Sequence, residues 1–253
     1  MPRFAANLSF LFAEHAFLDR FAAASRAGFR AVEFHSPYEH APGEIASRLA
    51  GAGLECVLFN LPMGDRAAGD FGIACLPGRE DEFRAGVARA LEYARVLACP
   101  RLNCIAGVAP PRSDPGEIRT RLAANLRFAA RECALAGVDL VVEPINRVDV
   151  PGFAVATSDE AMALVGEVEG LGLQYDLYHM AMAGEDLAEG LDRLAPAIRH
   201  VQFADAPGRH EPGTGRIDFP GLFARLDANG YRGWVSAEYR PAKRTEDTLG
   251  WLS

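Results

Sequence analysis

The sequence predicts an α/β fold in which eight parallel strands close into a (β/α)8 barrel, the TIM barrel architecture, as a single domain over residues 1–253. Apolar strand-like segments alternate with helix-like segments eight times, and no shift in composition marks a second domain. The length of 253 residues matches the roughly 250 residues typical of such barrels. A doubly wound open sheet is the alternative, but no Gly-x-Gly-x-x-Gly motif follows the first expected strand, which disfavours dinucleotide binding.

The expected elements alternate from one end of the chain to the other. Glycines close two of the helices, and two further helices open on the capping motifs Asp114-Pro115-x-Glu117 and Thr157-x-x-Glu160. The expected strands span residues 3–8, 29–34, 54–60, 101–105, 138–143, 171–175, 198–203 and 234–238. The expected helices span residues 17–27, 44–52, 79–98, 115–136, 157–169, 185–194 and 219–229, with a short closing helix from residue 246.

One connection is longer than the others. Residues 61–78, which include several Gly and Pro, separate the third strand from the third helix. Loops of this length in compact domains are usually functional or disordered. We interpret this loop as one that covers the substrate.

Composition excludes several classes of protein. A net charge of −8 disfavours a nucleic-acid surface, which needs a basic patch, but it leaves room for a small anionic substrate held by local arginines. No segment has the length and apolar character of a membrane span, so no membrane partner is expected. Five cysteines form no Cys-x-x-Cys pair, which is typical of reduced thiols and predicts a cytoplasmic protein. The sequence leaves a homo-oligomer open.

The last four expected strands each end in a residue with a side-chain oxygen. Residues 138–142 are apolar at four of five positions, and Glu143 and Pro144 follow where the ladder must stop. The same pattern returns at Asp176, Gln202 and Glu238. A single polar residue at a strand end is often there only because it is solvated. Four in succession favour a functional site at the rim of the barrel, where the active sites of (β/α)8-barrel enzymes lie. Three carboxylates this close need a cation among them, and all-oxygen ligation suits Mg²⁺ or Mn²⁺.

Three further residues are candidates for substrate binding. His179 lies three residues beyond Asp176, and we interpret it as a hydrogen-bond donor to the substrate. Arg209 opens a loop rich in Gly, Pro and charge, and Arg240 follows Glu238 closely. Either arginine could hold a substrate carboxylate through two hydrogen bonds, with Arg209 the first candidate. A surface histidine and a solvated loop are the alternative interpretations.

The chain resembles the hydroxypyruvate isomerase family of the xylose-isomerase-like barrel superfamily over essentially its whole length. The resemblance is carried by residues 2–9 (PRFAANLS), 76–80 (LPGRE), 209–212 (RHEP) and 233–239 (GWVSAEY). It implies a divalent metal held by Glu143, Asp176, Gln202 and Glu238, with Glu143 and Glu238 as the catalytic pair and His179 on the substrate. Related ketose epimerases carry His where Gln202 stands, and a neutral amide is a weaker ligand.

The resemblance also implies an activity, the interconversion of hydroxypyruvate and 2-hydroxy-3-oxopropanoate through an enediol. Two carboxylates on either side of a bound substrate can supply the base and the acid for this reaction. A 2-oxo-tetronate isomerase and a ketose 3-epimerase are alternatives on the same scaffold. A metal-dependent apurinic endonuclease fits the acidic composition poorly, and a non-catalytic sugar-acid binding protein would not need the paired carboxylates.

Overall fold

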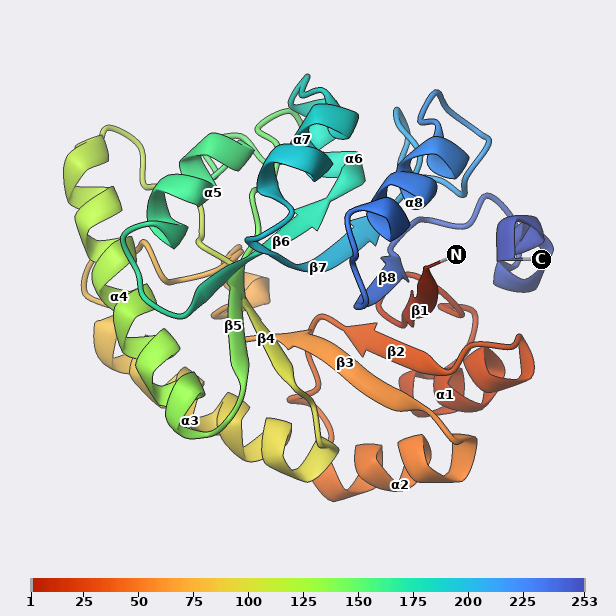
Figure 1. The fold of residues 1–253 in the computed structure, drawn as a ribbon. Helices are drawn as coiled ribbons and strands as arrows, with labels where there is room; N and C mark the ends of the chain where they lie inside the picture. Colours follow the sequence, from red (N-terminus) through yellow and green to blue (C-terminus); the bar gives the residue numbers. More distant parts are fainter. Residues whose placement is uncertain (1, 253) are drawn as a thin grey trace.

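A computed structural model describes residues 2–252 and contains a closed barrel of eight parallel strands, surrounded by helices (Figure 1). Each strand pairs with its neighbour in the sequence, and the first strand pairs with the last, so the predicted fold class is confirmed. The strands are β1 (Arg3–Asn7), β2 (Ala31–Phe34), β3 (Glu55–Asn60), β4 (Arg101–Cys104), β5 (Asp139–Val142), β6 (Leu171–Asp176), β7 (Ile198–Phe203) and β8 (Trp234–Ala237).

The helices lie on the outside of the barrel and begin largely where the capping motifs predicted. Asp114 accepts a hydrogen bond from the backbone N–H of Glu117 at 2.9 Å, and Thr157 accepts one from Glu160 at 3.2 Å. The helices are α1 (Phe17–Arg26), α2 (Pro42–Ala52), α3 (Glu80–Leu97), α4 (Pro115–Leu135), α5 (Ser158–Val165), α6 (Leu177–Met182), α7 (Leu187–Leu194) and α8 (Phe219–Ala228).

Two elements differ from the sequence-based expectation. Helix α6 was not predicted, because six residues are too few to show a helical period; it starts directly after β6, and the side chain of Asp176 caps it. The closing helix expected from residue 246 is instead a pair of 3₁₀ turns, Thr245–Thr248 and Gly250–Leu252. A third 3₁₀ turn, Arg66–Ala68, lies inside the long loop of residues 61–78.

The interior of the barrel is polar as well as apolar. Glu33 of β2 is completely buried and contacts His200 at 2.6 Å, the amide of Gln202 at 2.6 Å and the amide of Asn7 at 2.8 Å. Burial alone would raise the pKa of Glu33, but the charge of His200 and several hydrogen bonds outweigh it and lower the pKa. This buried network joins β1, β2 and β7 directly beneath the rim where β8 ends.

The loop between β7 and α8 is fixed by one buried carboxylate. Asp205 has no exposed surface, and its oxygens accept hydrogen bonds from the backbone N–H groups of Gly213 at 2.8 Å, Gly215 at 2.8 Å and Ile217 at 3.1 Å. A Cβ on Gly215 would lie 2.3 Å from the carbonyl oxygen of Ala206, so only glycine fits there. The segment that carries Arg209 is therefore held against the barrel.

Among the described helices, none combines the length and the apolar character that crossing a bilayer requires.

Replacing Asp205 with Ala should destabilise the protein substantially. At least three backbone N–H groups would lose a buried acceptor, and each such loss costs up to about 1–3 kcal/mol, less where water replaces the acceptor. We therefore expect the free energy of unfolding, measured by urea denaturation, to fall by at least ~2 kcal/mol. Asp218→Ala is the control, since this exposed carboxylate caps α8 with one bond and should cost only ~1 kcal/mol. Equal losses in the two variants would contradict the anchoring role of Asp205.

Candidate active site

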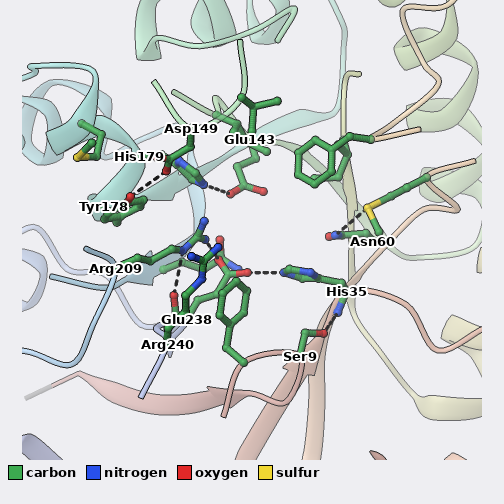
Figure 2. Close-up of a pocket in the computed structure, with 18 of the residues that line it drawn as sticks. Ser9, His35, Asn60, Glu143, Asp149, Tyr178, His179, Arg209, Glu238 and Arg240 are labelled. Carbon is green, nitrogen blue, oxygen red and sulfur yellow. Dashed lines mark hydrogen bonds and ion pairs between the residues drawn. The ribbon is translucent and has the colours of Figure 1, made fainter. Parts of the chain in front are cut away.

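The four predicted strand-end residues lie together at the carboxyl-terminal end of the barrel. Glu143 and Glu238 follow directly after β5 and β8, Asp176 is the last residue of β6, and Gln202 lies in β7. All four are at most 4% exposed. A cavity of about 660 Å³ opens above them (Figure 2). It is lined by six of the seven predicted site residues, namely Glu143, His179, Gln202, Arg209, Glu238 and Arg240.

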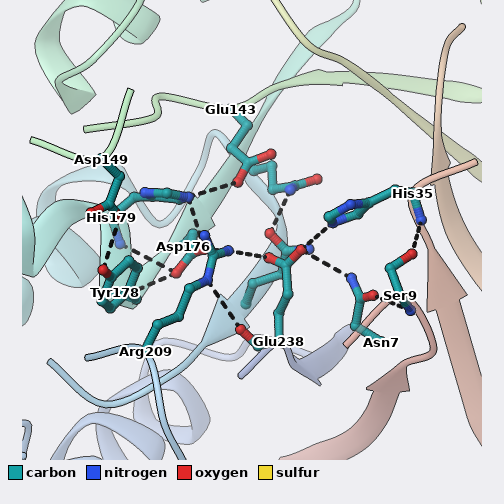
Figure 3. Close-up of polar contacts among 12 residues, drawn as sticks. Asn7, Ser9, His35, Glu143, Asp149, Asp176, Tyr178, His179, Arg209 and Glu238 are labelled. Carbon is teal, nitrogen blue, oxygen red and sulfur yellow. Dashed lines mark hydrogen bonds and ion pairs between the residues drawn. The ribbon is translucent and has the colours of Figure 1, made fainter. Parts of the chain in front are cut away.

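A continuous chain of polar contacts crosses this site. Nε2 of His179 lies 3.9 Å from Oε1 of Glu143 and 3.7 Å from Oδ2 of Asp176. The Arg209 guanidinium lies 3.5 Å from Oδ2 of Asp176 and 3.0 Å from Oε2 of Glu238 (Figure 3). Glu143, Asp176 and His179 also bring carboxylate and imidazole atoms within 4.8 Å of one another, so the described residues contain a cluster with the spacing of a metal site.

Gln202 is oriented differently from the three carboxylates. Its Nε2 donates to Oε1 of Glu33 at 2.6 Å, and its Oε1 accepts from Nε2 of Gln174 at 2.6 Å. Because Glu33 is an acceptor, it fixes which end of the Gln202 amide carries the N–H groups. The amide oxygen of Gln202 keeps one lone pair for a further contact.

Burial and nearby negative charge raise the pKa values of two carboxyl groups of the site, Glu143 and Asp176. Burial, followed by the charges of Glu238 and Asp176, raises the pKa of Glu143 well above its ordinary value. Burial also raises the pKa of Asp176 to about 7, although Arg209 opposes the shift. The same carboxylates outweigh burial at Arg209 and raise the pKa of its guanidinium, which therefore stays charged. The site attracts positive charge, and in the chain itself Arg209 supplies it.

The proton on His179 can be assigned from its neighbours. Oδ1 of Asn146 accepts the backbone N–H of Asp149 at 2.8 Å, so the Asn146 amide nitrogen must face Nδ1 of His179, 2.7 Å away. Burial, together with the nearby charge of Arg209, lowers the pKa of His179 well below its ordinary value. The imidazole is therefore neutral, and its proton is on Nε2, which faces Glu143 and Asp176.

Arg209 is held from several sides. Its guanidinium carbon lies 4.9 Å from the ring centre of Phe10 and 5.0 Å from that of Tyr178. Its backbone has a positive φ of 58°, which few non-glycine residues adopt. Sequence analysis assigned Arg209 to a substrate carboxylate, but in the structure it contacts the protein's own carboxylates. Arg240 is exposed, and its recorded hydrogen bonds are made by the backbone.

The first four strands also end in residues that contact the site, and sequence analysis missed them. His35 follows β2 and contacts Oε1 of Glu238 through Nε2, and Asn7 of β1 donates to the same oxygen at 3.1 Å. Asn103 of β4 donates to Oε2 of Glu143 at 2.8 Å and to Oδ1 of Asn60, the last residue of β3, at 3.1 Å. The strand-end criterion, applied to all eight strands rather than the last four, would have found them.

Comparison with known proteins places the chain in a family. Residues 21–253 match the family model described as xylose isomerase-like TIM barrel. The chain is 48% identical to the 2-oxo-tetronate isomerase of Cupriavidus necator, covering 100% of this chain and 98% of that protein. It is 45% identical to the hydroxypyruvate isomerase of Escherichia coli, with the same coverage of 100% and 98%. The chain therefore belongs to the xylose isomerase-like TIM barrel family. Within that family it is an isomerase of the hydroxypyruvate isomerase type, as its sequence motifs predicted.

Solved structures agree on the fold. A Brucella melitensis protein described as "AP endonuclease, family 2" superposes with a TM-score of 0.97 at 42% identity, covering 100% of this chain and 98% of that chain. An L-ribulose 3-epimerase superposes with a TM-score of 0.77 at 24% identity, covering 99% of this chain and 86% of that one. The second likeness concerns the fold alone.

The raised pKa of Asp176 predicts a pH-dependent stability in chelator-treated protein. An unfolded Asp ionises near pH 3.9, whereas the folded group ionises near 7, so the folded state holds an extra proton between these values. The contribution of protonated Asp176 to the free energy of unfolding is fully present below pH 3.9 and is lost as the pH rises through 7.

Asp176→Asn removes this contribution. Between pH 5 and 8, we expect the wild type to lose on the order of 2 kcal/mol of unfolding free energy relative to the variant, measured by urea denaturation in EDTA. Asp81→Asn, an exposed position, should give a curve parallel to that of the wild type. A curve for Asp176→Asn that also runs parallel to the wild type would show that Asp176 titrates normally.

Proposed function

We propose that this isomerase interconverts hydroxypyruvate and 2-hydroxy-3-oxopropanoate by moving a proton between adjacent carbons. The observation that carries the proposal is the pair Glu143 and Glu238, which approach one cavity from β5 and β8, strands that are not neighbours in the barrel. A substrate bound in this cavity would lie between a carboxyl group on each side. Such a pair can remove a proton from one carbon of the substrate to form an enediolate and deliver a proton to the neighbouring carbon, while the hydroxyl proton passes from one substrate oxygen to the other.

The two glutamates lie in different surroundings, which suits one of them to act as the base and the other as the acid. Glu143 receives one hydrogen bond, from Asn103, and its raised pKa favours taking up a proton. Glu238 accepts hydrogen bonds from Arg209 at 3.0 Å and from Asn7 at 3.1 Å and contacts His35, so its oxygens act as acceptors in the structure. We therefore assign the base that first removes the substrate proton to Glu238 and the acid to Glu143.

The donor set fits a divalent cation. When all three carboxyl groups are ionised, Glu143, Asp176 and Glu238 contribute three negative charges and Arg209 one positive charge, so one dication would bring the site to neutrality in that state. These carboxylates and the free lone pair of Gln202 would hold Mg²⁺ or Mn²⁺, which prefer oxygen ligands. When bound, the ion would stabilise negative charge on the substrate oxygens.

His179 fits a role on the substrate rather than on the metal. Its Nδ1 accepts from Asn146, so Nε2 keeps its proton and has no lone pair to offer a cation. A neutral N–H directed toward the cavity can instead donate to a substrate oxygen on which charge develops. Asn146 and Asp149 thus hold His179 in the tautomer that this role requires.

A four-carbon substrate is the main alternative, supported by the relative named 2-oxo-tetronate isomerase. The cavity of about 660 Å³ has room for either acid. Cleavage of DNA at apurinic sites, which the name of the Brucella protein suggests, is disfavoured because buried carboxylates line the cavity and the chain carries a net charge of −8. The cytoplasmic location remains a prediction. Turnover of short oxo acids, with and without chelator, tests the activity.

The glutamate pair yields a sharp mutational prediction. Gln keeps the shape and an oxygen donor but cannot carry a proton near neutral pH, so Glu143→Gln and Glu238→Gln should each lose at least ~10²-fold in kcat at saturating metal. Asp176→Asn is the matched comparison, because it should weaken metal affinity more than it slows the metal-saturated enzyme. Near-normal kcat in both Gln variants would refute the two-carboxylate scheme.

Isotope exchange tests the proton route independently. A carboxylate that has taken a proton from carbon exchanges it with water between turnovers, so the reaction in D₂O should place deuterium on the carbon that gains hydrogen. Mass spectrometry or ¹H NMR of the product measures this incorporation. Complete retention of the substrate hydrogen would indicate a hydride shift or one shielded base, and glutamate-mediated exchange would be excluded.

A further inference from the structure

The site described above lacks a cation for the carboxylate of its own substrate. With the proposed dication, the three carboxylates and Arg209 already sum to zero, and Arg209 is committed to Asp176 and Glu238. Asp149 adds a negative charge at the cavity wall, where it accepts from Tyr178 at 2.8 Å. A substrate acid would therefore enter with an unpaired charge unless another arginine receives it.

Two other arginines line the cavity, Arg66 and Arg240. Within residues 2–252, no carboxylate is recorded in an ion pair with either side chain, so both keep a free charge. They differ in how they are held. Arg66 donates from Nη1 to the carbonyl oxygen of Asp70 at 3.2 Å, and its guanidinium carbon lies 4.8 Å from the ring centre of Phe71. The recorded hydrogen bonds of Arg240 belong to its backbone.

The loop that carries Arg66 is itself firmly placed. The Asp65 carboxylate caps the Arg66–Ala68 turn by accepting from the N–H groups of Ala67 and Ala68 at 2.9 and 3.3 Å. Asp70 is fixed by an ion pair of 3.0 Å with Arg79. The Cβ of any residue replacing Gly72 would come within 2.4 Å of the carbonyl oxygen of Ile105, so this end of the loop packs directly on the barrel.

Phe71 completes the support for Arg66. It lines the same cavity and packs edge-on against Phe153, with ring centres 6.0 Å apart. The guanidinium is thus positioned before a ligand arrives, with one of its five N–H groups in a recorded hydrogen bond. A cation held in this way loses little conformational entropy when it binds an anion, and its planar group can bind a carboxylate through two hydrogen bonds.

We propose that Arg66 binds the carboxylate of the substrate and makes the enzyme selective for an oxo acid over a neutral ketose. The inference rests on the proposed isomerase function and adds to it a residue that determines specificity. The reacting carbons lie over Glu143 and Glu238, and the carboxylate points toward the loop of residues 61–78. That loop then contributes to recognition through one fixed cation, whether or not it moves.

The test compares Arg66→Met with the wild type, since methionine keeps an apolar stem over Phe71 and removes the charge. For hydroxypyruvate and a four-carbon 2-oxo acid we expect KM to rise about 10- to 100-fold with kcat within threefold, because the lost contact is present in ground and transition states alike. For D-erythrulose, a neutral four-carbon ketose, KM should change less than twofold. Arg66→Lys should recover part of the affinity for the acids.

Arg89→Met is the matched control. Arg89 lies over the rings of Tyr38 and Tyr93 at 4.9 and 5.8 Å and donates to the carbonyl of Tyr38 at 2.8 Å, yet it does not line the cavity. Arg89 therefore has the same kinds of contact as Arg66, an aromatic ring and a backbone carbonyl, but cannot reach a substrate in the cavity. Its KM values should equal those of the wild type. Arg240→Met is made in parallel as the competing assignment.

Measuring the binding of an unreactive acid tests the Arg66 site independently of the proposed reaction. Calorimetric titration with D-erythronate, an unreactive four-carbon acid, should show a Kd at least tenfold higher in Arg66→Met, whereas weak binding of erythritol, followed by NMR, should not change. If the wild type turns over no oxo acid but loses erythronate affinity in this way, the proposed reaction fails and the Arg66 site stands. Unchanged erythronate affinity, equal losses for acid and neutral ligands, or a loss confined to Arg240→Met would each overturn the Arg66 site.

Discussion

The repulsion between three buried carboxylates is the constraint around which the rim of this barrel is arranged. Glu143, Asp176 and Glu238 are at most 4% exposed, and burial would leave them protonated or unstable without positive charge. Arg209 supplies part of this positive charge, and several surrounding groups hold its guanidinium beside the carboxylates. Asp205 fixes its loop, while the ring centres of Phe10 and Tyr178 lie 4.9 and 5.0 Å from its guanidinium carbon. The charge that remains is the one a divalent cation would neutralise.

A second layer below the rim sets the direction of the site groups. Glu33 and His200 lie in contact inside the barrel, and Glu33 accepts the hydrogen bond that orients Gln202 from below. Asn7 donates both to Glu33 and to Glu238, so one side chain links the buried pair to the proposed base. A barrel interior filled only with aliphatic side chains would pack well but could not orient these amides. The polar interior therefore belongs to the function as much as to the fold.

Sequence periodicity predicted the barrel because apolar strand-like segments alternate with helix-like segments, several of which begin or end on a recognisable capping residue. It also predicted which strand ends carry carboxylates, since Pro144 shows where the β5 ladder must stop. It could not show where side chains point. Gln202 faces Glu33, and Arg209 contacts the protein's carboxylates rather than solvent; both depend on partners distant in the sequence. His35 was missed for a different reason, because the strand-end criterion was applied only to the last four strands, and the contact of His35 with Glu238 joins residues far apart in the sequence.

The bond between Asn7 and Glu238 joins residues 231 positions apart, and it crosses the seam where β1 pairs with β8. A ribosome makes β1 before β8, so β1 has no partner at this seam until β8 has been synthesised. Contacts of such large sequence separation form late because the chain entropy must be lost before they are made. The proposed catalytic pair of Glu143 and Glu238 is therefore incomplete in every chain that ends before Glu238. Enzymatic activity measured during biosynthesis would therefore appear only after β8 has paired with β1 and the barrel has closed.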